Sequence, residues 1–132
     1  MDIRNGRELP GVWTEGAGRR FLSLLYRPEK DDIPDLAFGF VHIPSQTAAT
    51  AHEHDATDEF WVIVTGTGEA VVGDERGGLK PGDVVHGPPG IPHQLINTSE
   101  DAPLEAVYIL CPAGDERNVV EMMARQSPQF LE

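Results

Sequence analysis

Frequent glycine and proline residues are the feature that most constrains how this chain can fold. Eleven prolines and fourteen glycines interrupt 132 residues, so few segments are long enough for a regular helix. The segments between them alternate polar and apolar residues or stay apolar over a few positions, a pattern typical of strands. The sequence therefore predicts an all-β protein built as a sandwich or barrel.

Eight strands are expected, separated by turn sequences such as Gly73-Asp74 and Lys80-Pro81-Gly82-Asp83. Their ranges are 21–26, 35–43, 47–54, 59–64, 69–72, 83–86, 93–97 and 104–110. One short C-terminal helix is expected after them, because Val119, Met122 and Met123 have helical spacing. Asp115 is a suitable N-cap for this helix, which should end before Ser127-Pro128.

Composition narrows the classes of function. The chain has 22 Asp and Glu against 10 Lys and Arg, a net charge of −12, which disfavours binding to phosphate backbones or anionic membranes. No apolar segment approaches the roughly 20 residues of a membrane span. We therefore expect one soluble, cytoplasmic domain over residues 1–132 that binds neither nucleic acid nor membrane. The single cysteine, Cys111, follows an apolar segment, and we expect it to be buried in the core.

Four polar residues have the spacing of a metal site. His52 and His54 are separated by one residue, so in a strand their side chains would leave the same face. Glu59 begins the next apolar strand, and an antiparallel return would bring it back beside this pair. His93 follows the segment 88–92, whose prolines restrict its backbone. Three neutral imidazoles and one carboxylate suit a transition-metal ion and leave coordination positions open.

These residues resemble the two sequence motifs of the cupin superfamily. The first motif corresponds to His52-x-His54, four residues, Glu59, six residues and Gly66. The second corresponds to Gly82, five residues, Pro88-x-Gly90, two residues, His93, three residues and Asn97. Where the family has a glycine six residues before the first histidine, this chain has Gln46, a departure that concerns the loop and not a ligand.

The resemblance implies a double-stranded β-helix, a jelly-roll barrel, as a single cupin domain with its core at about residues 35–112. It also implies one divalent transition-metal ion per chain, held by His52, His54, Glu59 and His93. Iron is the ion that we favour, and manganese, nickel and zinc are alternatives. Many members of the family are dimers, so a homodimer is expected, and the other expected partner is a small-molecule substrate.

Strand periodicity suggests which side chains surround the ion. Trp61 shares a face with Glu59, and Leu95 shares a face with His93, so both are candidates for the substrate pocket. His42 is a third candidate, although an exposed or hydrogen-bonded imidazole is the safer interpretation. The opposite side chains of strand 59–64 are apolar as well, so we expect another strand or a partner subunit to cover them.

Two residues are candidate catalytic groups. His86 could act as a general acid or base if it faces the cavity. Tyr108 could donate its hydroxyl to a bound oxyanion, and core packing is the alternative interpretation. One of the arginines Arg19, Arg20 and Arg27 could hold a substrate carboxylate, although a solvated surface position would also explain them.

The resemblance leaves the reaction open, because the family includes enzymes of several classes and non-catalytic binders. The hypothesis that we favour is a metal-dependent oxidoreductase, a dioxygenase acting on a small oxygenated organic substrate. The second hypothesis is a Lewis-acid isomerase, lyase or polyketide-type cyclase, with His86, Tyr108 or His42 as the base. The third is a non-catalytic module that binds a metal or a small ligand.

Overall fold

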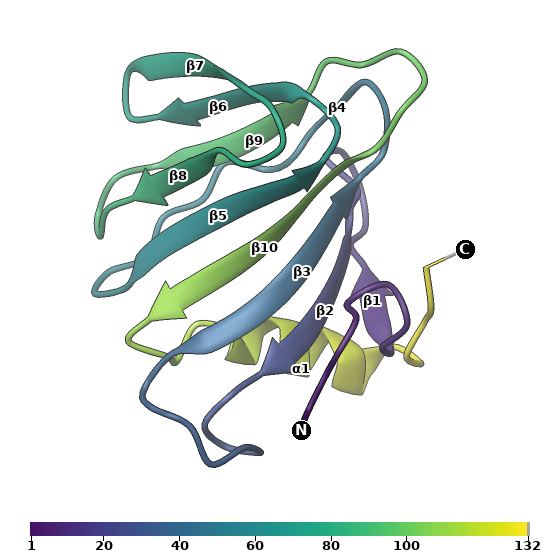
Figure 1. Cartoon of the computed structure of the whole chain (residues 1–132), viewed down its shortest axis with the longest axis vertical. Coiled ribbons are helices and arrows are strands. Elements are labelled where there is room, and N and C mark those ends of the chain that lie inside the picture. The colour runs from purple at the N-terminus through teal and green to yellow at the C-terminus, as the bar shows by residue number, and fades with distance from the viewer. Residues whose placement is uncertain (132) are drawn as a thin grey trace.

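The computed structural model describes residues 1–131 as two antiparallel sheets with one helix beside them (Figure 1). The six-stranded sheet has the order β1-β2-β3-β10-β5-β8, and the four-stranded sheet has the order β4-β9-β6-β7. The strands are β1 (Gly11–Trp13), β2 (Phe21–Tyr26), β3 (Ala37–Ile43), β4 (Thr47–Ala48), β5 (Asp58–Thr65), β6 (Gly68–Val72), β7 (Glu75–Leu79), β8 (Val84–Gly87), β9 (His93–Asn97) and β10 (Leu104–Cys111). This arrangement confirms the expected all-β jelly-roll fold.

Three strands differ from the sequence-based expectation. β1 and β7 were not expected, because one has three residues and the other, Glu-Arg-Gly-Gly-Leu, lacks an apolar pattern. The expected strand 47–54 is regular only over Thr47–Ala48, after which His52 forms an isolated bridge with His93. Both β1 and β2 belong to the six-stranded sheet, although they precede the core expected at about residues 35–112.

The main core lies between the two sheets and follows from the two-residue period of the strands. On β5, Trp61 and Ile63 point inward with Glu59, while the residues between them point outward and are only half-buried. On the opposite sheet, Leu95 of β9 is 2% exposed and faces the same core. Glu59 is therefore a charged group on an otherwise apolar inner face.

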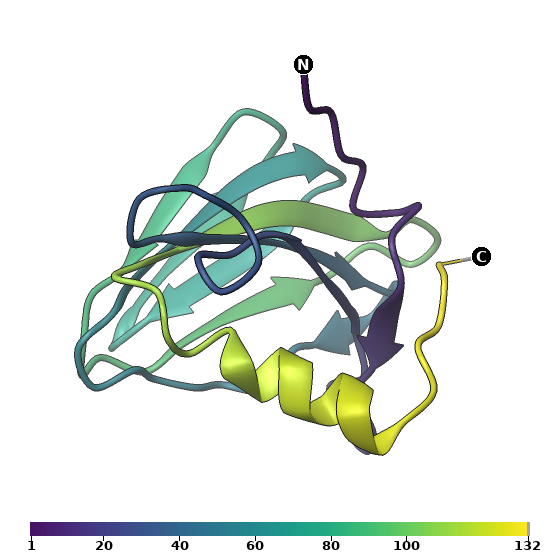
Figure 2. The same ribbon diagram turned by 90° about the horizontal axis from the view of Figure 1, so that it is seen from below.

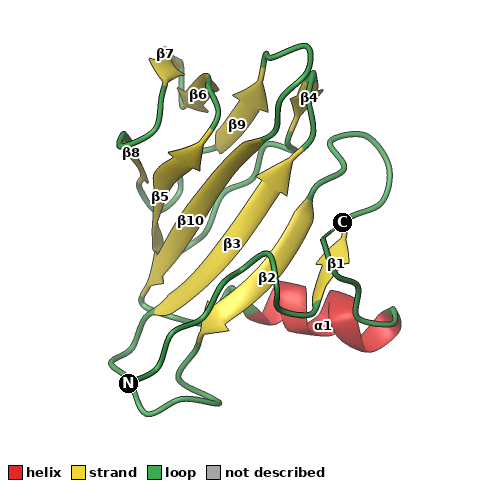
Figure 3. Ribbon diagram, turned by 45° about the vertical axis from the view of Figure 1, so that its right-hand side comes forward, coloured by secondary structure: helices red, strands yellow, loops and turns green. Residues whose placement is uncertain are grey.

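The helix α1 (Arg117–Arg125) packs against β1 and β2 beside the edge of the larger sheet (Figure 2; Figure 3). Val119 is buried, and Met122 and Met123 pack onto the core, as their spacing predicted. The N-cap position is Glu116, without a side-chain capping bond, so the expectation that Asp115 caps the helix was wrong. No helix within residues 1–131 is long and apolar enough to cross a membrane.

The outer face of the larger sheet is only partly covered by the chain itself. The N-terminal segment lies against β2, where the Ser23 hydroxyl donates to the carbonyl of Gly6 at 2.8 Å. Farther along the sheet, Val64 of β5 is 44% exposed and Val84 of β8 is 60% exposed. Cys111 is also exposed, contrary to expectation, because Leu110 takes the inward position on β10 and the next side chain must point out.

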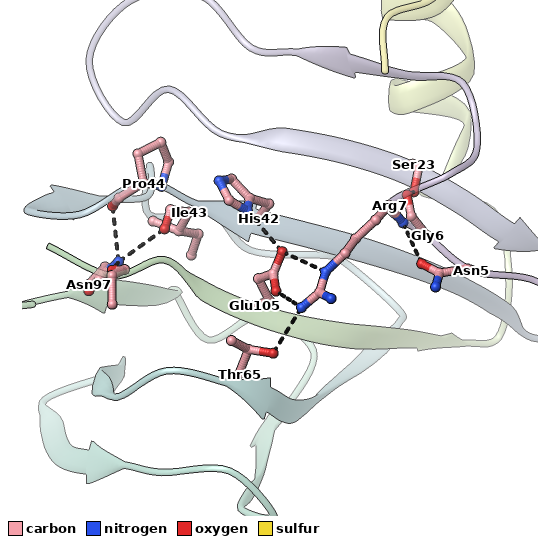
Figure 4. Close-up of polar contacts among 11 residues, drawn as sticks. Asn5, Gly6, Arg7, Ser23, His42, Ile43, Pro44, Thr65, Asn97 and Glu105 are labelled. Carbon is pink, nitrogen blue, oxygen red and sulfur yellow. Dashed lines mark hydrogen bonds and ion pairs between the residues drawn. The ribbon is translucent and has the colours of Figure 1, made fainter. Parts of the chain in front are cut away.

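His42 belongs to this outer face and not to the core. Its Nδ1 donates to Oε2 of Glu105 at 2.9 Å (Figure 4). Its ring meets the ring of Trp13 edge-on. Arg7 donates to both oxygens of Glu105 and, at 3.1 Å, to the hydroxyl of Thr65. The expectation that His42 lines the substrate pocket was therefore wrong, because β3 turns this imidazole away from the interior.

Asn97, the last residue of the second motif, has a structural role. It is 1% exposed, and its Nδ2 donates to the carbonyls of Ile43, Pro44 and Ala102 at 2.8–3.1 Å (Figure 4). Its Oδ1 accepts from the backbone N–H of Ser99 at 2.9 Å. One side chain thus joins the ends of β3 and β9 to the loop that precedes β10.

We expect Glu105→Gln to lower the free energy of unfolding at pH 7 by roughly 1.5–3 kcal/mol, because it weakens charge-assisted hydrogen bonds to a buried group. Burial raises the pKa of Glu105, but the bonds from His42 and Arg7 outweigh it and hold the pKa at about 2. The native pKa is thus below that of the unfolded chain, so this stabilisation is complete above about pH 4.5 and is lost towards pH 2.

Urea unfolding at pH 7 and pH 3 measures this effect. The difference between wild type and Glu105→Gln should narrow at the lower pH, and an unchanged difference would contradict the assignment. Glu69→Gln is the matched control, because it breaks the exposed pair with Arg76, and it should cost less than about 0.5 kcal/mol.

Candidate metal centre

Backbone pairing brings the residues of the candidate metal centre together. His52 and His93 exchange two backbone hydrogen bonds, of 3.0 Å and 2.8 Å, which join the segment before β5 to the start of β9. His54 follows on the same segment, and Glu59 is the second residue of β5 on the facing sheet. His52 and His93, which are 41 positions apart in the sequence, therefore meet between the two sheets.

The four side chains converge on one point. Nε2 of His52, His54 and His93 lies 3.0, 2.9 and 3.0 Å, respectively, from Oε1 of Glu59. The four ligand atoms all lie within 4.8 Å of one another. His93 and Glu59 are buried, whereas His52 and His54 are partly exposed towards the cavity.

The other ring nitrogen of each histidine already has a hydrogen-bond acceptor. Nδ1 of His52 faces the carbonyl of Thr50 at 3.2 Å, and Nδ1 of His93 faces the carbonyl of Ile91 at 3.0 Å. Nδ1 of His54 lies 2.5 Å from Oδ2 of Asp115. When a ring is neutral with its proton on Nδ1, these acceptors hold that proton, and Nε2 then presents a lone pair, as a metal ligand requires.

The electrostatics favour an ionised carboxylate. Burial alone would raise the pKa of Glu59, but its hydrogen-bond contacts with the three imidazoles outweigh this and hold the pKa well below its usual range. The contact with Glu59 is also the main cause of a raised pKa of His54. A buried carboxylate and three imidazoles whose Nε2 atoms converge on it form a donor set that suits a divalent transition-metal ion.

A cavity of about 680 Å³, measured with its open mouth, lies next to this cluster. Much of its wall is apolar and comes from both sheets and from α1. The apolar residues are Leu22, Val41, Ile43, Ala49, Trp61, Leu95, Leu110, Val119 and Met122. The polar lining residues beyond the cluster are Arg20, Tyr108, Asp115, Glu116 and Asn118. A small organic molecule could therefore lie within reach of the metal ligands, largely shielded from water.

Three of the residues expected near the ion line this cavity, and two do not. Trp61, Leu95 and Tyr108 face it and are each less than a tenth exposed. The ring of Trp61 meets that of His93 edge-on, with 5.1 Å between centroids. His42 lies on the outer face of the sheet, as described above.

His86 also lies outside the cavity, so the expectation that it acts there as an acid or base was wrong. It is on the outward face of β8, where it stacks on Phe60 at 4.7 Å between ring centroids. Its Nε2 lies 2.6 Å from the exposed Asp58. The inward position next to it on β8 is occupied by Gly87, which explains the outward direction of the imidazole.

Two glycines make room for side chains of the site. A Cβ on Gly87 would lie 2.8 Å from Nδ1 of His93, and a Cβ on Gly39 would lie 2.0 Å from the ring of Tyr108. Glycine in a strand marks such close approaches, and both positions carry this signal in the sequence. Gly39 pairs with Tyr108 across β3 and β10, so the phenol lies over the glycine.

Residues around the start of α1 contribute to the site, which was not predicted from the sequence. Asp115 contacts His54, and Glu116, 3% exposed, lines the cavity. Asp115 lies 61 residues beyond His54 in the sequence, and the acidic residues of this segment resemble an ordinary helix start. No local pattern could have shown that the segment returns to the metal ligands.

Comparison with known proteins agrees with this geometry. A family model described as a cupin domain matches residues 39–110, more than half of the chain. The chain therefore belongs to the cupin family. No curated protein sequence matches it closely enough to indicate a relative.

Several solved structures share the fold at low sequence identity. A predicted oxalate decarboxylase from Thermotoga maritima has a TM-score of 0.74 at 20% identity, covering 86% of this chain and 100% of its own. A Cupin 2 conserved barrel domain protein from Salinispora arenicola has a TM-score of 0.68 at 22% identity, covering 96% and 98%. KdgF from Halomonas sp. has a TM-score of 0.62 at 21% identity, covering 80% and 90%. At these identities the similarity establishes the fold alone.

We expect His93→Ala to lose most of its bound metal while keeping a folded barrel. The imidazole is one of four converging ligands, whereas the apolar core of the two sheets does not depend on an ion. Metal content measured by elemental analysis, together with far-ultraviolet circular dichroism, tests this. His86→Ala is the matched control, because it removes an imidazole from the outer face and should keep wild-type occupancy.

We expect Asp115→Asn to weaken metal binding by about 10–100-fold, because the carboxylate orients His54 and increases its basicity. Competition with a chromophoric chelator measures the affinity. Asp101→Asn, a substitution of the same kind in the loop before β10, serves as the control. Equal affinities for Asp115→Asn and wild type would show that the contact has no role in binding.

Proposed function

We propose that this cupin is a metal-dependent oxygenase that acts on a small oxygenated organic molecule. The observation that carries the proposal is the convergence of three imidazoles and a carboxylate beside a largely apolar cavity. An ion held there would supply Lewis acidity and, if it is iron, redox chemistry with dioxygen at coordination positions open to the cavity.

The residues of the chain bind, orient and shield the substrate. The apolar walls exclude water, and Trp61 gives one face of the cavity an aromatic surface. Tyr108 keeps its proton, because burial and the nearby Glu59 raise the pKa of its hydroxyl well above the usual value. It therefore serves as a hydrogen-bond donor to the substrate and not as a base.

The placement of the histidines is the reason to prefer the oxygenase over Lewis-acid proton transfer. A Lewis-acid isomerase, lyase or cyclase needs a base within reach of the substrate. Of the three bases considered from the sequence, His42 and His86 lie outside the cavity, and Tyr108 holds its proton. The oxygenase hypothesis has no such requirement.

One observation favours a Lewis-acid enzyme as the second candidate. Glu116 is a buried carboxylate that lines the cavity, where its Oε1 accepts the backbone N–H of Gly114 at 2.5 Å. It could take a proton from a carbon next to a carbonyl group. Turnover without dioxygen that is lost in Glu116→Gln would select this candidate.

The first test is elemental analysis of untagged protein purified without chelator or added metal, with Glu59→Ala as the blank. We expect about one iron per chain in the wild type and little in the variant. Oxygen consumption is then measured with a diketone, a catechol and a thiol, and at least one should be consumed by wild type and not by Glu59→Ala. Zinc or nickel with oxygen-independent turnover would favour the second candidate, and a folded chain without metal would favour a non-catalytic binder.

A further inference from the structure

Arg20 differs from the other half-buried arginines of the chain. Arg4 pairs with Asp31 and Asp2, and Arg27 pairs with Glu29. Arg20 lines the cavity, and its only side-chain hydrogen bond within residues 1–131 is a long one, 3.4 Å, from Nη1 to the carbonyl of Gly18. Most of its five N–H donors are therefore free to bind something in the cavity.

Two hydrogen bonds anchor the backbone of Arg20 beside the cavity. The N–H of Arg20 donates to the Thr14 hydroxyl at 3.0 Å, and its carbonyl accepts from the Thr14 N–H at 2.9 Å. These bonds close the loop between β1 and β2, and Arg20 comes immediately before β2. The residue is thus anchored beside the cavity through its backbone, and burial lowers the pKa of its guanidinium.

Tyr108 supplies a second unpartnered group in the same cavity. Its hydroxyl oxygen is the one buried side-chain polar atom of residues 1–131 that lacks a hydrogen-bond partner. A buried hydroxyl without a partner destabilises the fold by roughly 1–3 kcal/mol, so such groups are uncommon unless a ligand uses them. The ring lies over Gly39, on the strand adjacent to β2, and Arg20 contributes to its electrostatic surroundings.

We infer that Arg20 and Tyr108 form a carboxylate-binding subsite, so that the substrate is a small organic acid whose carboxylate pairs with Arg20 and accepts the Tyr108 hydroxyl proton. This inference rests on the proposed function and names its substrate class. A planar guanidinium matches a carboxylate with two parallel hydrogen bonds. Arg20 is the one arginine or lysine among the residues that line the cavity, so it is the group there that attracts an anion.

Binding of benzoate tests the subsite, with benzamide as its neutral counterpart and calorimetry as the measurement. Zinc-loaded wild type is compared with Arg20→Gln and with Arg19→Gln. Arg19 is the matched control, because it is an exposed neighbour that lies over the ring of Trp13 and changes the net charge equally. We expect Arg20→Gln to weaken benzoate binding at least about tenfold and Arg19→Gln less than about twofold, because only Arg20 makes a charge-assisted bond.

Tyr108→Phe gives a second, independent readout. Removing a hydroxyl that has no protein partner should leave the unfolding midpoint unchanged or raise it, while benzoate binding weakens about three- to tenfold. If Tyr108 only packed in the core, Tyr108→Phe would not weaken benzoate binding while it left the unfolding midpoint unchanged or raised. Each variant is checked for wild-type circular dichroism before titration.

The same titrations on a Glu59→Gln background separate this inference from the proposed function. If benzoate binding still depends on Arg20 there, the subsite exists without an intact metal centre, even if no substrate consumes oxygen. Three results would overturn the inference: no benzoate binding to wild type, equal binding to wild type and Arg20→Gln, or equal affinity for benzoate and benzamide.

Discussion

The ionised carboxylate of Glu59, placed on the apolar inner face of a β-barrel, is the interaction on which the site depends. A buried charge is costly unless groups of opposite polarity surround it, and here three imidazoles converge on one of its oxygens. To place them, the chain pairs His52 with His93 and leaves regular strand geometry after β4. The resulting cluster is better suited to a cation than to a neutral hydrogen-bond network.

The fold and the metal ligands could be predicted from sequence because both depend on short-range patterns. Strand periodicity, turn residues and the spacing within each of the two motifs are local, and the resemblance to the cupin superfamily relates His93 of the second motif to His52, His54 and Glu59 of the first. Gln46, which stands where the motif has glycine, adopts a φ of 54°, a left-handed conformation that glycine adopts more easily.

The sequence-based predictions that were wrong or missing concern the direction of side chains and the contacts between distant segments. His42 and His86 are on strands whose two faces are both partly covered, so an apolar pattern does not show which face is inside. Asp115 could not be assigned to His54, because tertiary folding alone brings the segment before α1 to the cavity. Local sequence therefore defined the metal cluster, and long-range packing decided what surrounds it.

The contact between Asp115 and His54 also connects the centre to the C-terminal part of the chain. Asp115 is two residues before α1, and beyond the helix Gln129 pairs with Gly11 of β1. The helix lines the cavity with Val119 and Met122, so the segment that contacts a metal ligand also forms part of the cavity wall. An ion that binds the native arrangement of His54 would therefore stabilise this segment against local unfolding as well as the centre itself.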